Sequence, residues 1–308
     1  HTGSLSYIMG GAGTGKTAIL LCLASRLDDA GVPVEFICSP ALGKHLSSYA
    51  GVNMKSLLGT TSHTVILVDD PAGPQDVSAW GSRTSRDRKN VIVAFDPLQW
   101  RGKRLEDQMA RLPKAREHTL RTCYRQGENL ARQAQNLVAT VHDLSSWRID
   151  RKKVAAERQF LKMLESEYLG NLALVRPGGR VKVIPSPQSL RMFRDEAESM
   201  RDRWYRWTDL PSMLLLQDSE HGVRLSKDLR TPLTGVKMLS ASLDDVERFR
   251  GLEFQSVWIL MEERFYNDIQ HGKTGLSSAE WEQLRDLHIA LTRAKDEMLI
   301  FLWKAQWH

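Results

Sequence analysis

The stretch that decides the fold is GGAGTGKT, residues Gly10 to Thr17. It fits the pattern G-x-x-x-x-G-K-[ST], with Lys16 and Thr17 in the last two places. The apolar segment 5–9 before it favours a short strand, and segment 17–27 after it is typical of an amphipathic helix. In a strand–loop–helix unit, backbone N–H groups and the helix dipole can hold a phosphate. The stretch therefore predicts a nucleotide-binding α/β domain.

The residue types of this loop suit ATP and Mg²⁺. Lys16 would reach the β- and γ-phosphates, and the Thr17 hydroxyl would be a ligand of Mg²⁺. The loop alone serves kinases, switches, motors and transporters, so it does not reveal what the nucleotide is used for. The candidate ATP-binding residues of the loop are Gly10, Gly11, Ala12, Gly13, Thr14, Gly15, Lys16 and Thr17.

Composition limits the protein class. A chain of 308 residues with 42% hydrophobic content has room for one or two domains. The net charge of +6 permits a polyanionic partner without requiring one. We find no apolar run that could span a membrane and no signal peptide before the loop, and the three cysteines lack paired or metal-ligand spacing. We expect an intracellular protein, cytoplasmic or nuclear, that has no membrane partner.

The pattern along the chain predicts two α/β domains. Apolar runs at 32–39, 64–70 and 90–96 are rich in Val and Ile without strict alternation, which is typical of buried strands in a parallel sheet. The polar segment 106–122 then suggests a hinge, and a second series of strand and helix patterns follows. We place the first domain at residues 1–115 and the second at 116–308.

Two strand ends carry candidate catalytic residues. Asp69 and Asp70 follow the run at 64–68, where Asp69 would bind Mg²⁺ and Asp70 would orient or deprotonate the attacking water. The alternative is that they form an Asp-Asp-Pro turn. Gln99 follows the next run and is a candidate sensor of the γ-phosphate.

The order of motifs resembles the UvrD/Rep-like branch of the superfamily 1 helicases. The matching elements span residues 10 to 295 and keep the family's order. They read GGAGTGKT, VDDPA, FDPLQ, TCYRQ, FRGLEF and IALTRAK. The resemblance implies two RecA-like P-loop NTPase domains in tandem, each a parallel sheet flanked by helices, with ATP in the cleft between them.

The same resemblance assigns residues to the far side of the nucleotide. Arg125 and Arg293 would act as arginine fingers that project from the second domain. Gly251 and Glu253 match the element that touches the nucleotide and links it to the nucleic-acid strand. The implied activity is that of an ATP-dependent translocase or helicase on single-stranded DNA or RNA.

Candidate contacts with nucleic acid lie beside two of these motifs. Ser39 and Pro40 match the first strand-contacting element of the family. Trp100, next to the candidate sensor, would stack on a base, the alternative being that it packs in a core or between domains.

The sequence departs from the family pattern in several places. Asp70 replaces the usual glutamate, Phe95 a glycine and Arg250 a lysine, and only nine residues precede Gly10, so the usual adenine-reading glutamine is missing. The compact spacing is similar to that of nuclease-fused or Schlafen-type helicase regions, which predicts an additional N-terminal domain or a partner protein. Asp70, Phe95 and the missing glutamine favour a second hypothesis, an ATP-binding regulatory switch with weak or no hydrolysis that controls an attached domain or partner, whereas Lys16, Gln99, Arg125 and Arg293 favour the translocase or helicase. A small-molecule kinase is a more distant third.

Overall fold

The computed structural model divides the chain into two compact units. The first comprises His1–Arg125, Ile149–Ala173 and Arg248–Leu252, and the second comprises Gln126–Arg148, Leu174–Glu247 and Glu253–His308. The structure describes residues 3–39, 42–43, 65–71, 73–100, 109, 111–133, 173–176, 178–186, 188–204, 212–216, 238–249, 252–270 and 278–304. In these ranges none of the helices combines the length and the apolar character that crossing a membrane requires.

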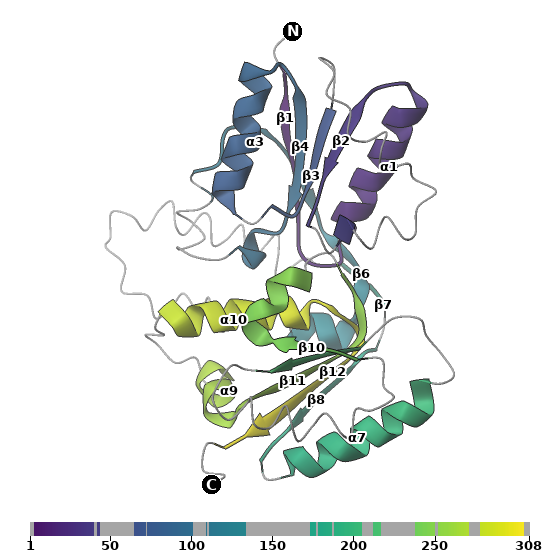
Figure 1. Ribbon diagram of the computed structural model, residues 1–308, viewed down its shortest axis with the longest axis vertical. Coiled ribbons are helices and arrows are strands. Elements are labelled where there is room, and N and C mark those ends of the chain that lie inside the picture. The colour runs from purple at the N-terminus through teal and green to yellow at the C-terminus, as the bar shows by residue number, and fades with distance from the viewer. Residues whose placement is uncertain are drawn as a thin grey trace. The chain divides into compact units, whose positions relative to one another are not determined.

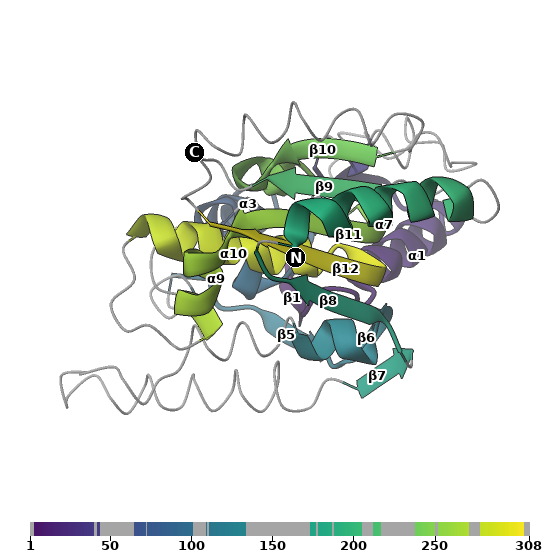
Figure 2. The same cartoon turned by 90° about the horizontal axis from the view of Figure 1, so that it is seen from below.

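The first unit is built on a five-stranded sheet in the order β2-β3-β4-β1-β5, and all of its strand pairs are parallel. Figure 1 labels β1 to β4 of this sheet, and Figure 2 labels β5. Its elements are β1 (Leu5–Gly10), α1 (Lys16–Asp29), β2 (Val34–Ile37), β3 (Val65–Asp69), α3 (Pro74–Arg86), β4 (Asn90–Phe95), the 3-10 turn η1 (Pro97–Gln99) and β5 (Arg116–Leu120). The strands expected at 5–9, 32–39, 64–70 and 90–96 are confirmed. The segment expected to be a hinge contains β5, a polar strand at the edge of the sheet. Hydropathy alone does not indicate that β5 pairs with β1.

Helices cover both faces of this sheet. Leu20 and Ala24 of α1 pack on one face in a cluster that includes Ile8, Leu67 and Ala94. On the other face α3 lies close to β1, where a Cβ atom at Gly81 would be 3.2 Å from a Leu5 methyl carbon. Burial from both sides explains why β3 is apolar at every position before its final aspartate.

The second unit also has a parallel five-stranded sheet, in the order β10-β9-β11-β12-β8. Its elements are β8 (Arg180–Ile184), α7 (Ser189–Trp204), β9 (Ser212–Leu216), β10 (Met238–Ser242), the 3-10 segment η4 (Leu243–Phe249), β11 (Phe254–Glu262), α9 (Glu263–Gln270), α10 (Ser278–Leu291) and β12 (Ala294–Trp303). Helices α7 and α10 lie on opposite faces of this sheet (Figures 1 and 2).

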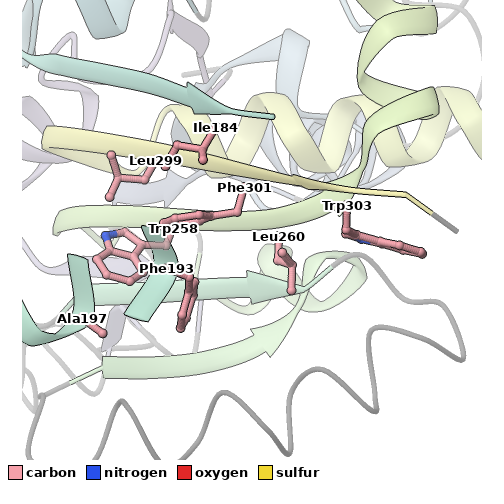
Figure 3. Packing of buried hydrophobic residues seen from close by; sticks show 8 residues of the cluster. All are labelled: Ile184, Phe193, Ala197, Trp258, Leu260, Leu299, Phe301 and Trp303. Carbon is pink, nitrogen blue, oxygen red and sulfur yellow. The ribbon is translucent and has the colours of Figure 1, made fainter. Parts of the chain in front are cut away.

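The face of the second sheet under α7 holds an aromatic core (Figure 3). Phe193 of α7 packs edge-on against Trp258 of β11 and Phe301 of β12, with ring centroids 5.1 and 5.0 Å away. Ile184, Ala197, Leu260, Leu299 and Trp303 complete this cluster.

Strands β6 (Thr122–Gly127) and β7 (Ala173–Arg176) pair with each other, and the division between the units falls inside both. The fold class of α/β with parallel sheets flanked by helices is therefore confirmed. That the two units are tandem RecA-like domains stays a prediction, as does the boundary between residues 115 and 116.

Candidate nucleotide site

The glycine-rich loop joins the end of β1 to the start of α1, as the sequence predicts. Gly13 and Gly15 have φ angles of 75° and 88°, in the left-handed region that favours glycine. A Cβ atom at Gly13 would lie 2.6 Å from the Cβ atom of Arg125, so this position also lacks space for a side chain. The backbone path of the loop therefore depends on its glycines.

The side chains of Lys16 and Thr14 donate hydrogen bonds to backbone carbonyls of the loop itself. The Lys16 ammonium donates hydrogen bonds to the carbonyls of Gly10 and Gly11, at 2.8 and 2.9 Å, and the Thr14 hydroxyl donates to Gly11 at 2.8 Å. Burial lowers the pKa of Lys16, and the nearby carboxylates of Asp96, Asp70 and Asp69 offset only part of this effect. The Lys16 side chain is therefore held against the backbone carbonyls at the bend of the loop.

The loop and the candidate acids share one edge of the first sheet. Strand β4 lies between β3 and β1, and all three run parallel. Their carboxyl ends, with Asp69 and Phe95 as the last residues of β3 and β4, therefore lie at the edge from which the loop leaves β1. This edge is where open α/β sheets bind ligands.

Thr17 and Asp69 form the contact expected of a Mg²⁺ site. The Thr17 hydroxyl donates to Oδ2 of Asp69 at 2.7 Å. The other carboxylate oxygen, Oδ1, is buried and has no hydrogen-bond partner among the described residues. Burial raises the pKa of Asp69 to about 6, against the effect of the Thr17 hydrogen bond. A buried carboxylate oxygen without a partner is costly unless a cation or water meets it.

The donor atoms of this contact fit Mg²⁺. A hydroxyl and a single carboxylate are hard oxygen ligands, and Mg²⁺ usually binds through one or two carboxylates together with substrate phosphates. Within the described ranges, His, Cys, Asp and Glu side chains do not gather in groups of three that could hold a metal by themselves. The chemistry therefore fits a cation that arrives with a nucleotide.

Asp70 follows Asp69 in an unusual backbone conformation. Its φ angle is 52°, in the left-handed region, and its backbone N–H donates to the carbonyl of Ala94 in β4 at 2.8 Å. Aspartate tolerates this region better than most residues with a side chain. The strand end thus places two consecutive carboxylates at the sheet edge.

The candidate sensor lies in the turn η1. The Gln99 amide donates to the Asp96 carboxylate at 2.8 Å, and both side chains are buried. The negative charge of Asp96 also raises the pKa of Lys16, so the residue that binds the candidate sensor interacts electrostatically with the phosphate loop. Sequence reasoning gave no role to Asp96, although its place after a buried strand was a signal of the same kind as that of Asp69.

Trp100 lies in the core of the first unit. Its ring is fully buried and stacked on Phe95, with centroids 4.7 Å apart and planes at 17°. Its indole N–H donates to the carbonyl of Pro71 at 3.0 Å. Core packing, the alternative to base stacking, is thus the arrangement observed. A contact with nucleic acid stays a prediction that would require the ring to leave this stack.

Strand β6 is hydrogen-bonded to the phosphate loop. The Tyr124 N–H donates to the Gly13 carbonyl at 2.9 Å, and the Cys123 thiol donates to the Ala12 carbonyl at 3.5 Å. The charge of Arg125 acts on both Lys16 and Asp69. Arg125 itself belongs to the first unit, whereas the resemblance implied a finger from the second domain.

Tyr124 was missed by sequence reasoning. Its side chain is 58% exposed although its backbone is bonded to the phosphate loop. An aromatic ring in that place is a surface on which a nucleobase can stack. The signal was its position beside Arg125 in the TCYRQ motif.

In the second unit the structure brings Glu253 and Arg293 to the same end of the sheet. The carbonyl of Arg293 accepts a hydrogen bond from the N–H of Phe254, the residue after Glu253, at 3.0 Å. The Arg293 side chain is buried and donates to Ile289 and Thr292. The role of Arg293 as an arginine finger and the contact of Glu253 with nucleotide stay predictions.

Of the remaining candidates, only Ser39 lies in the described residues. Its hydroxyl accepts a hydrogen bond from the Leu42 N–H at 3.2 Å, and its contact with nucleic acid stays a prediction. Pro40, Arg250 and Gly251 lie outside the described residues.

Comparisons with known proteins give only distant likenesses. No family model and no curated protein matches the chain. Among solved structures it is similar to the PRRSV helicase, at 13% identity and a TM-score of 0.45, over 98% of this chain and 53% of that one. It is similar to the Pif1 helicase from Candida albicans at 11% identity and a TM-score of 0.38, over 97% of this chain and 91% of that one. A third likeness, to the Pyrococcus furiosus Hef helicase domain, has 9% identity and a TM-score of 0.29, over 99% of this chain and 93% of that one.

These likenesses are too low to support an argument about function. The chain also spans only about half the length of the PRRSV helicase structure. The functional conclusion therefore depends on the geometry of the site and on the motifs.

Proposed function

We propose that this chain is an ATP-dependent translocase or helicase that acts on single-stranded DNA or RNA. The observation that carries the ATPase part is the Thr17–Asp69 hydrogen bond of 2.7 Å beside the glycine loop, with Oδ1 of Asp69 buried and unpartnered among the described residues. This arrangement fits a triphosphate that arrives with Mg²⁺.

Each residue of the site has a chemical task in this proposal. The loop N–H groups and Lys16 bind the phosphates, and Thr17 and Asp69 bind Mg²⁺. Mg²⁺ held by Thr17 and Asp69 would supply charge neutralisation for the bound phosphates. Asp70 accepts a proton from the water that attacks the γ-phosphorus, while the bond to the bridging oxygen breaks and ADP leaves.

The nucleic-acid part of the proposal is supported by sequence. The six ordered motifs span most of the chain, and the net charge of +6 permits a polyanionic partner. Arg125 supports a coupling between the nucleotide site and the second unit. Its charge lowers the pKa of both Lys16 and Asp69, and its strand, β6, continues into the second unit. An additional N-terminal domain or a partner protein is part of the same proposal.

A second candidate function is an ATP-binding regulatory switch with weak or no hydrolysis. Gln99 favours it, since one N–H of its amide is already bonded to Asp96 in this structure. The shorter reach of Asp70 compared with a glutamate favours it as well, because small misplacements of a catalytic group are costly.

The deciding experiment is the ATPase rate of the full chain with and without single-stranded DNA and single-stranded RNA. We expect stimulation by at least one polymer, and a loss of about 100-fold or more for Lys16→Ala, which removes the amino group that would bind the phosphates. The matched control is Lys114→Ala at an exposed lysine, which should leave the rate unchanged.

The outcomes separate the candidate functions. Nucleotide binding without polymer-stimulated hydrolysis would favour the switch over the motor. Failure to bind ATP at all would contradict both.

A further inference from the structure

Three buried aromatic rings form a column through the first unit. Tyr7 of β1 meets Phe95 of β4 edge-on with centroids 5.4 Å apart, and Phe95 stacks on Trp100 at 4.7 Å. All three rings are almost completely buried. The aromatic column therefore joins the strand that leads into the phosphate loop to the turn that carries the candidate sensor.

The far end of the column reaches the loop of the acid pair. The Trp100 indole N–H donates to the Pro71 carbonyl at 3.0 Å, and Pro71 follows Asp70 directly. On the other side of Asp70, its own N–H donates to Ala94 at 2.8 Å. Two hydrogen bonds thus bracket Asp70.

This bracket holds a conformation that Asp70 would not keep alone. Its φ angle of 52° lies in the left-handed region. A residue with a side chain is strained there and stays only when the surroundings fix it. The direction of the Asp70 carboxylate therefore depends on the groups that hold its neighbours.

We propose that Trp100 is a positioning residue for ATP hydrolysis, whose indole N–H fixes the Pro71 carbonyl and so aims the Asp70 carboxylate at the attacking water. The inference rests on the proposed function, in which Asp70 is the catalytic acid. It gives Trp100 a task inside the ATPase unit, in place of a contact with nucleic acid.

The same ring also connects the sensor to the acid. Gln99 immediately precedes Trp100, and the backbone N–H groups of Gln99 and Trp100 donate to Asp96 and Pro97 at 3.1 and 3.3 Å. A displacement of the Gln99 backbone toward a phosphate would therefore shift Trp100 against Phe95 and strain its hydrogen bond to Pro71. Through this path the position of Asp70 responds to the occupant of the phosphate loop.

The test removes the indole N–H while keeping an aromatic ring. In Trp100→Phe we expect kcat to fall by about 10- to 100-fold, as for a catalytic group misplaced by a fraction of an ångström to 1 Å, with nucleotide affinity unchanged. The matched control is Trp80→Phe, the same change at a half-buried tryptophan of α3. The second variant replaces Trp100 by benzothienylalanine, which keeps the ring shape and lacks the N–H. It decides the question alone if Trp100→Phe does not fold.

A second measurement is independent of turnover. Amide hydrogen exchange at Asp70, recorded by NMR without nucleotide, should become faster in both Trp100 variants and stay unchanged in the Trp80 control, because the bracket around Asp70 loosens. A purely packing role for Trp100 predicts no selective change at this amide in the benzothienylalanine protein.

The outcomes distinguish this inference from the proposed function. If the wild type hydrolyses ATP and the folded Trp100 variants match its kcat, the inference is wrong and the proposed function stands. A parallel loss of kcat and nucleotide affinity, or unchanged exchange at Asp70, would also overturn it. A wild type that does not hydrolyse ATP would overturn the proposed function and this inference together.

Discussion

At the residue scale, the structure accounts for two residues that differ from the helicase motifs that the sequence resembles. Asp70 occupies the left-handed region, which aspartate tolerates better than glutamate. Phe95, where those motifs have glycine, packs between Tyr7 and Trp100. The substitutions therefore belong to one local arrangement.

Replacing the Asp70 carboxylate by an amide tests its chemical role. Asp70→Asn keeps the size and the tolerance for the left-handed region but removes the proton acceptor. We expect the rate of ATP hydrolysis to fall by roughly 100-fold or more, with nucleotide binding retained. Single-turnover hydrolysis together with a nucleotide titration measures both quantities.

The matched control is Asp28→Asn, at an exposed aspartate of α1. It should hydrolyse ATP like the wild type. Full activity in Asp70→Asn would show that another group accepts the proton.

At the element scale, a polar network ties four elements of the second unit together. Arg180 of β8 donates to Glu196 of α7 at 2.5 Å and to Glu297 of β12 at 2.8 Å. Glu297 accepts from Ser256 of β11, whose hydroxyl accepts from the Trp258 indole. The network thus extends from the surface to the aromatic core.

This network makes stability depend on pH. Burial raises the pKa of Glu196, but the hydrogen bond and charge of Arg180, with Lys182, outweigh it and hold the pKa below the ordinary 4.5. A carboxyl with a lowered folded-state pKa contributes stability that is fully present above 4.5 and is lost as the pH falls through the folded-state value. Glu196→Gln should lower the free energy of unfolding at pH 7 by about 1 kcal/mol and flatten its dependence on pH in the acid range.

Urea unfolding at several pH values, followed by near-UV circular dichroism, measures this effect. Glu282→Gln, at an exposed glutamate of α10, is the control and should follow the wild type. An acid dependence of Glu196→Gln as steep as that of the wild type would contradict the assignment.

At the scale of the whole molecule, local patterns predicted local structure well. The strand–loop–helix unit around Lys16 and the placement of Asp69 beside Thr17 follow from buried parallel strands whose carboxyl ends meet at one edge. The features that the sequence did not predict depend on contacts between segments far apart in the chain. Strand β5 is polar, and Trp100 gives the same sequence signal whether it stacks on a base or on Phe95.

The three thiols of the chain differ sharply in accessibility, which has a practical consequence for labelling. Cys22 is exposed on α1, Cys38 is partly buried, and Cys123 is buried and donates a hydrogen bond from its thiol to the Ala12 carbonyl of the phosphate loop. Burial, and secondarily the charge of Asp69, raises the pKa of Cys38 to about 11, so little reactive thiolate forms at pH 8. Maleimide should therefore modify Cys22 first, as a time course of peptide mass spectra would reveal, and equal rates at Cys123 would contradict this order. A fluorophore can then be attached to the helix that begins at the phosphate loop without removing either of the other cysteines.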